Sequence, residues 1–156
     1  MKRREKLFGM GPRGTAISII LLAIAFYVNG RLGRPAMLAN PAPLKVAGML
    51  FICVGLMLYI ASVHRLRNWW RNDELCTSGP FRWFRHPMYA SWITFILPGV
   101  ALYSNSWVIL CCAIVLHPIW HLFVAREEKM MMETFQDQYK TYAAGTGRFI
   151  PRIRCS

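Results

Sequence analysis

Four apolar stretches, at residues 15–32, 44–63, 88–103 and 107–125, constrain the fold of this 156-residue chain more than any other feature. A transmembrane helix needs about 20 apolar residues, within a range of about 17 to 25. The second and fourth stretches reach that length alone, whereas the first and third need their flanking residues. The pattern predicts an all-α integral membrane protein with about four transmembrane helices, in a single membrane domain covering residues 1–156.

The excess of cations disfavours several other classes of protein. The chain has 19 Lys and Arg against 7 Asp and Glu, a formal net charge of +12, yet 55% of its residues are hydrophobic. A soluble domain of this size needs more charge than the 17% present. A disordered basic segment needs low hydrophobicity, and the same argument disfavours nucleic acid as a partner. We expect these cations to meet membrane lipids, because an anionic leaflet attracts them.

The positions of the cations predict the orientation of the helices. Sixteen lie in the N-terminal lead-in, in the connection between the second and third stretches, or in the C-terminal tail. Three lie in or beside the connection between the first and second stretches. By the positive-inside rule, both termini are predicted to be cytoplasmic. Six of the seven acidic residues lie in the connection between the second and third stretches or in the tail, so we expect the ionisable chemistry on the cytoplasmic side.

The first apolar stretch has a second interpretation. A basic segment precedes it, with cations at Lys2, Arg3, Arg4 and Lys6, and residues 23–25 read A-x-A. These are features of a cleaved signal peptide, which stays open as an alternative to a retained first helix. Against it, the A-x-A pattern lies inside the apolar run instead of after it.

The tail has the spacing of an amphipathic helix. Met131, Phe135, Tyr139 and Tyr142 are separated by four, four and three residues, which places them on one helical face. Gly145 is a helix-ending signal. We expect a C-terminal cytoplasmic amphipathic helix that continues the fourth span.

Two histidines lie inside the fourth stretch. His117 and His121 are one helical turn apart, and Glu128 returns to nearly the same face. Three interpretations stay open: a metal-binding face, polar packing against other helices, or a wall of a substrate or cofactor pocket. No further strong ligand has the spacing of a zinc site, so we assign no metal.

A glycine pattern precedes the first helix. Residues 9–14 match G-x-G-x-x-G literally. The dinucleotide-binding fingerprint needs a strand before this pattern and a helix after it, and here a membrane span follows without a strand. We therefore interpret the segment as a flexible lead-in.

Two polar segments flank the last two spans. Glu127 and Glu128 follow the fourth span directly, and being adjacent they point about 100° apart on a helix. They are either both solvated, or one of them is aimed at a cationic ligand. Residues 79–89 combine Arg, His, Tyr and aromatic side chains at the start of the third span. That segment is either an interface anchor or a site for an anionic group.

Together these segments resemble a known family. The blocks are Thr77-x-Gly79-Pro80-Phe81-Arg82-x-x-Arg85-His86-Pro87-x-Tyr89, a helical hairpin, Glu127-Glu128, Phe135-x-x-x-Tyr139-x-x-Tyr142 and Arg148-Phe149-Ile150-Pro151. In this order they resemble the isoprenylcysteine carboxyl methyltransferase and phospholipid N-methyltransferase superfamily, over a family-like core at about residues 74–151. One departure is Ser91, where members often have Gly two residues after the Tyr.

The resemblance implies a membrane methyltransferase that uses S-adenosylmethionine, bound in a cytoplasm-facing pocket under the last helical hairpin. Carried over from the family's motifs, the cofactor-binding residues are His86, Pro87, Tyr89, Glu127 and Glu128. The charges of the cofactor agree with this set, because a Glu can pair with its ammonium and Arg85 or His86 can take its carboxylate. Aromatic side chains such as Tyr89, Trp83 and Phe149 can pack on the adenine or face the sulfonium.

The catalytic candidates are Arg85, Glu128 and Arg148, and Arg82 is a further candidate cation. Methyl transfer is an in-line displacement that needs alignment and exclusion of water.

We expect a lipophilic or membrane-partitioned acceptor, like an isoprenylcysteine carboxylate or a phospholipid amine, in a multi-pass protein of a bacterial or archaeal inner membrane. The alternatives are an NADPH-dependent membrane reductase, since sterol reductases resemble this family's core, and a non-catalytic membrane subunit.

Overall fold

The computed structural model describes residues 11–69 and 74–152, and the secondary structure of these ranges is helical apart from two isolated β-bridges. The all-α prediction is confirmed for this part of the chain. Lys2, Arg3, Arg4, Lys6 and the first two residues of the G-x-G-x-x-G pattern lie outside it. The elements are α2 (Gly11–Arg31), α3 (Ala42–Trp69), the 3₁₀-helix η1 (Gly79–Arg82), α4 (Pro87–Ala90), the π-helix η2 (Ser91–Ile96), α5 (Leu97–Tyr103) and α6 (Trp107–Gly145).

Three of the described helices are long and apolar enough to cross a membrane, within the ranges Arg13–Arg31, Ala42–Arg67 and Trp107–Gly145. The third predicted span is a shorter apolar helix, Pro87–Tyr103. It consists of α4, η2 and α5 in succession. The count of four spans and the orientation of the termini therefore stay predictions.

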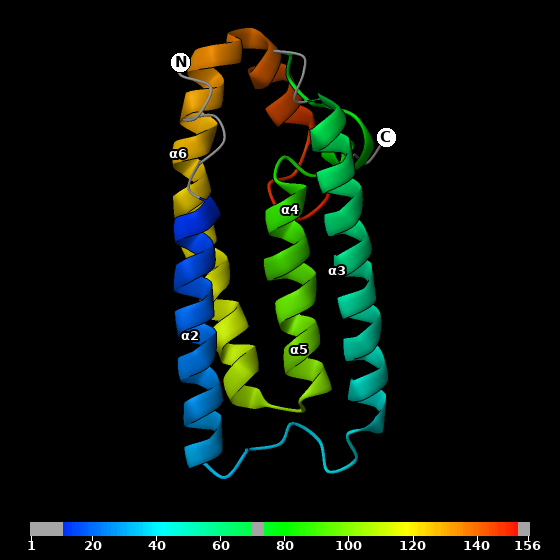
Figure 1. Cartoon of the computed structure of the whole chain (residues 1–156), viewed down its shortest axis with the longest axis vertical. Helices are drawn as coiled ribbons and strands as arrows, with labels where there is room; N and C mark the ends of the chain where they lie inside the picture. The colour runs from blue at the N-terminus through cyan, green and yellow to red at the C-terminus, as the bar shows by residue number, and fades with distance from the viewer. Residues whose placement is uncertain (1–10, 70–73, 153–156) are drawn as a thin grey trace.

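The helices form two neighbouring pairs (Figure 1). α2 lies beside α6, α3 lies beside the α4–η2–α5 helix, and α5 meets α6 near the turn that joins them. The α2–α3 and α5–α6 connections lie at one end of the bundle, where a β-bridge joins Ala36 to Ser106. We call this the loop end. The start of α4 and the last part of α6 lie toward the opposite end.

Small residues let α3 pack closely on its neighbour. A Cβ added to Gly48 would lie 2.6 Å from the carbonyl oxygen of Gly99, and one added to Gly55 would lie 2.9 Å from that of Ser91. Close backbone approach of this kind is typical of helices packed in membranes. Ser91 has an ordinary helical φ of −56°, and its hydroxyl donates to the carbonyl of Met88 at 2.6 Å. Serine therefore fits where the family often has glycine, because the position needs no positive φ.

The long helix α6 is not straight. It continues the fourth apolar stretch and ends at Gly145 as the sequence predicts, but Gln136 interrupts it with a φ of 44° and a ψ of −119°. The last turns of the helix then come back toward the start of α4 (Figure 1). The regular spacing of Met131, Phe135, Tyr139 and Tyr142 gave no sign of this bend, because the two pairs lie on either side of it.

Candidate functional site

The bend in α6 brings the tail against the segment that precedes α4. The backbone N–H of Arg85 donates to the carbonyl of Gly147 at 2.7 Å, and that of His86 donates to the carbonyl of Arg148 at 3.3 Å. The guanidinium of Arg85 also donates to the carbonyl of Ala143 at 2.8 Å. The backbone of residues 85–86 is therefore hydrogen-bonded to that of residues 147–148, which lie more than sixty positions later in the sequence. This pairing places Arg148 beside Arg85 and His86.

Glu128 is the centre of an ion-pair cluster. Arg148 donates through Nε to Oε1 at 3.0 Å and through Nη2 to Oε2. The Nε of Arg85 lies 2.9 Å from Oε1, and the Nε2 of His86 lies 3.6 Å from the same oxygen. Only 14% of the Glu128 side chain is exposed. Two guanidinium groups around a mostly buried carboxylate favour its ionised form.

Glu127 has different partners from its neighbour. The hydroxyl of Tyr89 donates to its Oε1 at 3.0 Å, and Nδ1 of His86 lies 3.7 Å from its Oε2. Among the described residues, no Lys or Arg nitrogen forms an ion pair with this carboxylate. The side chain is 13% exposed, so the interpretation in which both glutamates are solvated is wrong.

His86 lies between the two carboxylates. It precedes the first turn of α4, which Pro87 opens as the sequence predicts. Its ring stacks on Tyr89 with a centroid distance of 5.7 Å and an interplanar angle of 8°. The Nε2 atom is buried and makes no hydrogen bond within the described part of the chain. Buried polar atoms are usually paired, and Oε1 of Glu128 lies 3.6 Å from this nitrogen, just beyond hydrogen-bond distance.

Trp120 is a site residue that the sequence reasoning missed. It is 2% exposed, and its ring centroid lies 4.7 Å from that of Tyr89. Its indole Nε1 donates to the hydroxyl of Ser18 in α2 at 2.9 Å. Trp120 precedes Glu127 by seven residues, which is two helical turns. That spacing is the signal that would have placed it on the same face.

Phe149 closes the cluster from the tail. It is 1% exposed, and its ring meets His121 at a centroid distance of 4.7 Å and His117 at 5.7 Å. Nδ1 of His121 lies 3.1 Å from Nη1 of Arg148. The two histidines therefore pack against Phe149 and Arg148, as the polar-packing interpretation expects, and a role in a substrate or cofactor pocket stays a prediction. Within residues 11–69 and 74–152, no three His, Cys, Asp or Glu side chains gather as metal ligands.

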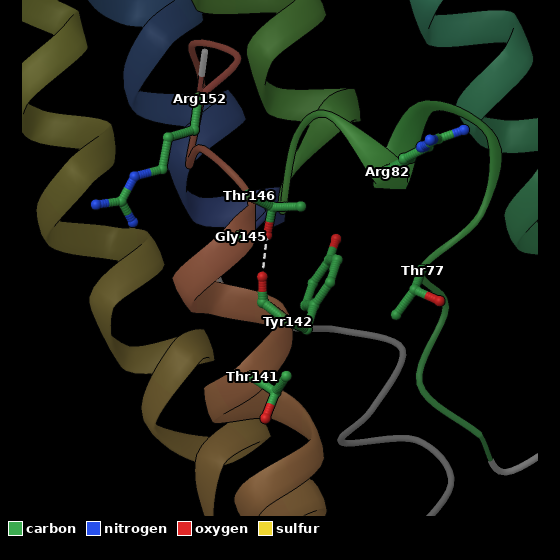
Figure 2. A pocket seen from close by; sticks show the side chains of 7 residues that line it. All are labelled: Thr77, Arg82, Thr141, Tyr142, Gly145, Thr146 and Arg152. Atoms are coloured by element: carbon green, nitrogen blue, oxygen red, sulfur yellow. Dashed lines mark hydrogen bonds between the residues drawn. The ribbon is translucent and has the colours of Figure 1, made fainter. Parts of the chain in front are cut away.

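Two candidates from the sequence lie outside this cluster. Trp83 is 59% exposed and does not pack on it. Arg82 lines a separate open pocket of about 380 Å³, whose other lining residues are Thr77, Thr141, Tyr142, Gly145, Thr146 and Arg152. Figure 2 shows the guanidinium groups of Arg82 and Arg152 diverging from the ring of Tyr142, with the Thr146 hydroxyl donating to the Tyr142 carbonyl at 2.6 Å. This pocket shares no residue with the ion-pair cluster.

The decisive comparison covers more than half of the chain. Residues 44–138 match the phospholipid methyltransferase family. The chain belongs to the phospholipid methyltransferase family. The resemblance drawn from the ordered motifs is therefore confirmed. The matched range includes Arg85, His86, Tyr89 and both glutamates, whereas α2 and Arg148 lie outside it.

A curated protein is also similar to this member of the phospholipid methyltransferase family. It is the protein-S-isoprenylcysteine O-methyltransferase of Tribolium castaneum, with 33% identity over 82 residues. The match covers 51% of this chain and 28% of that protein. No solved structure matches the chain. The family and the three apolar helices together indicate a multi-pass membrane protein.

Proposed function

We propose that the chain is an S-adenosylmethionine-dependent methyltransferase that acts on a lipophilic acceptor at the cytoplasmic face of a membrane. The observation that supports this most is the cluster around α4 and α6. Two carboxylates, two guanidinium groups and one imidazole gather there beside buried aromatic rings. Buried charges of this density are costly, and in membrane proteins they tend to be functional.

Two groups of the cluster are suited to the charged groups of S-adenosylmethionine. Glu127 has no Lys or Arg partner among the described residues and suits the ammonium group. His86 has a buried Nε2 with no hydrogen bond there, and with Arg85 beside it this nitrogen suits the carboxylate. When bound, S-adenosylmethionine supplies the activated methyl group on its sulfonium. These assignments give His86, Tyr89, Glu127 and Arg85 binding roles, with Pro87 setting the start of α4.

Glu128 is better suited to positioning than to direct binding. Its two oxygens are engaged by Arg148 and Arg85, and His86 lies beside them. It thereby holds three side chains from two distant segments in one place. Arg148 in turn closes the cluster next to His121. We propose that Glu128 and Arg148 fix the geometry in which Arg85 and His86 meet the donor.

The acceptor is proposed to be an isoprenylcysteine carboxylate or a phospholipid amine. A carboxylate can attack the methyl group without a general base, whereas an amine must first lose a proton. The aromatic side chains Tyr89, Trp120 and Phe149 exclude water from the site, which favours displacement over side reactions. A lipophilic acceptor partitions into the bilayer, which explains why the site stands beside membrane helices. The cytoplasmic orientation rests on the distribution of the cations.

Donor binding tests the proposal directly. Isothermal calorimetry on the purified chain in lipid nanodiscs should show binding of S-adenosylmethionine and of its demethylated product, S-adenosylhomocysteine. NADPH should not bind. If NADPH bound and S-adenosylmethionine did not, the chain would be a reductase-like protein instead. Binding of neither would favour a non-catalytic subunit.

The acceptor requires a second assay. Protein in nanodiscs is incubated with methyl-labelled donor and either prenylcysteine analogues or a phospholipid extract. Transfer of label to an ester on the prenylcysteine carboxylate identifies one class of acceptor, and transfer to a lipid amine identifies the other. No transfer to either, despite donor binding, would contradict the proposed acceptor classes.

A further inference from the structure

One face of α2 is directed at the candidate site. Gly11, Gly14 and Ser18 are separated by three and four residues, so they lie on the same side of the helix. Ser18 is fully buried, although much of α2 is exposed. The whole helix lies outside the family-matched residues 44–138. Its contribution to the site is therefore a property of this chain that the family match does not describe.

Ser18 fixes the indole of Trp120. The Nε1 of Trp120 donates to the Ser18 hydroxyl at 2.9 Å, and that hydroxyl donates to the carbonyl of Gly14 at 2.8 Å. Both polar groups are buried and both are satisfied. Because the indole N–H donates to this buried hydroxyl, the ring is held against Tyr89 at a centroid distance of 4.7 Å.

The two glycines leave room for the same pair of aromatic rings. A Cβ added to Gly14 would lie 2.8 Å from Cη2 of Trp120, and one added to Gly11 would lie 2.8 Å from the hydroxyl oxygen of Tyr89. Real Cβ atoms do not approach other atoms so closely, so a side chain here would displace the ring. The displaced Tyr89 hydroxyl is the group that donates to Glu127.

We infer that α2 is a wall of the proposed donor site and that Gly11, Gly14 and Ser18 are positioning residues for Tyr89 and Trp120. The inference rests on the proposed function and specifies which part of the donor this wall recognises. The faces of two electron-rich rings attract the positive charge of the sulfonium, which the thioether product lacks. This wall therefore favours the cationic sulfonium donor over its neutral thioether product.

Alanine substitutions in α2 test the inference against a matched control. Gly14→Ala and Gly11→Ala displace the rings, whereas Gly30→Ala lies in the same helix with no atom within 4 Å of its added Cβ. All three changes raise helix propensity, so the control reproduces that effect. The dissociation constants for S-adenosylmethionine and S-adenosylhomocysteine are measured by calorimetry on the full chain in nanodiscs.

We expect Gly14→Ala to weaken binding of S-adenosylmethionine by about tenfold and to weaken binding of the product less, so that the preference for the cationic donor falls. Gly11→Ala should change the same ratio, and Gly30→Ala should leave both constants unchanged. A merely structural defect would lower binding of both ligands equally. If the unchanged chain binds the donor but Gly14→Ala and Gly11→Ala behave like Gly30→Ala, the inference is wrong. If the unchanged chain binds no donor, the proposed function itself fails.

Ser18→Ala gives a second route that adds no atoms and so introduces no steric clash. It leaves the buried Trp120 N–H without an acceptor, and we expect the same fall in donor preference, by about threefold. In a Trp120→Phe background the N–H is gone, so Ser18→Ala should then have no further effect on the ratio. An equal effect of Ser18→Ala in both backgrounds would show that the Ser18–Trp120 bond does not carry the preference.

Discussion

The two ends of the bundle are both held by side-chain hydrogen bonds, but with different chemistry. At the loop end, the Oδ1 of Asn105 accepts from the N–H groups of Met37 and Leu38, and the hydroxyl of Ser106 donates to Asn29. All of these groups are neutral. At the other end, which we call the site end, hydrogen bonds and ion pairs join charged and polar side chains: Arg85, His86, Tyr89, Glu127, Glu128 and Arg148.

The contrast separates what holds the helices together from what can bind a ligand. A neutral amide or hydroxyl closes a connection at little cost in desolvation. A partly buried ion pair gains little net stability, because removing the charges from water offsets their attraction. The site end therefore has more charge than the fold requires. We expect substitutions at the loop end to change stability alone and those at the site end to change ligand binding.

The largest expected effect is that of Glu128→Gln. The change leaves the guanidinium groups of Arg85 and Arg148 without their carboxylate in a mostly buried cluster. Removing one partner of such a pair is expected to lower the free energy of unfolding by about 3 kcal/mol. Donor binding should fall as well, because Arg85 and His86 lose their positioning. Thermal unfolding in detergent and donor calorimetry measure the two effects.

The control for this change is Glu133→Gln in the same helix, because Glu133 is exposed. It removes the same charge and should alter neither quantity. If Glu128→Gln matched this control in stability, the ion-pair cluster would not hold the tail against α4. The site end would then be no more dependent on charge than the loop end.

The next effect is that of Glu127→Gln, which should separate binding from stability. The hydroxyl of Tyr89 can still donate to the amide oxygen, so the fold keeps this contact. The negative charge proposed for the donor's ammonium is lost, and we expect donor binding to weaken by about thirtyfold with little change in the unfolding midpoint. A fall in stability as large as that of Glu128→Gln would contradict the division between the two glutamates.

The sequence predicted the positions of the helices better than the bend that returns the end of α6 to the start of α4. Apolar run lengths gave the positions of the described helices, because burial in lipid demands long apolar segments. The ordered motifs gave Arg85, His86, Tyr89 and the two glutamates, which the fold does bring together. The reversal at Gln136 was not predictable from side-chain spacing, because a tertiary pairing of Gly147 with residues 83–85 accompanies it.

The contribution of α2 escaped prediction for a different reason. The interpretation of residues 9–14 as a flexible lead-in is wrong from Gly11 onward, where α2 begins, and Gly11 and Gly14 leave space for Tyr89 and Trp120. Such a role depends on which helix lies opposite, and periodicity within one helix carries no information on that. The seven-residue spacing between Trp120 and Glu127 can be read from the sequence. It does not reveal that α2 packs against Trp120.

The smallest expected effect is at the loop end, where Asn105 has a φ of 51°. Its side chain bonds to Met37 and Leu38, and its Nδ2 donates to the Leu38 carbonyl at 2.8 Å. Asn105→Gly keeps the left-handed backbone accessible and removes these bonds, so we expect the free energy of unfolding to fall by about 1 kcal/mol. Asn105→Ala loses the same bonds but keeps a Cβ at positive φ, which glycine lacks, so it should lower the free energy of unfolding by about 1 kcal/mol more than Asn105→Gly does.

Donor binding should be unchanged in both Asn105 variants. This result would show that the loop end affects stability without affecting the site end. The glycine and alanine variants lose the same hydrogen bonds, so the difference in their unfolding midpoints isolates the backbone strain. If donor binding fell in proportion to stability across the two variants, the loop end would set the geometry of the site through α5 and α6. The charges of the site end would then depend on the neutral end for their placement, and the separation of stability from binding would fail.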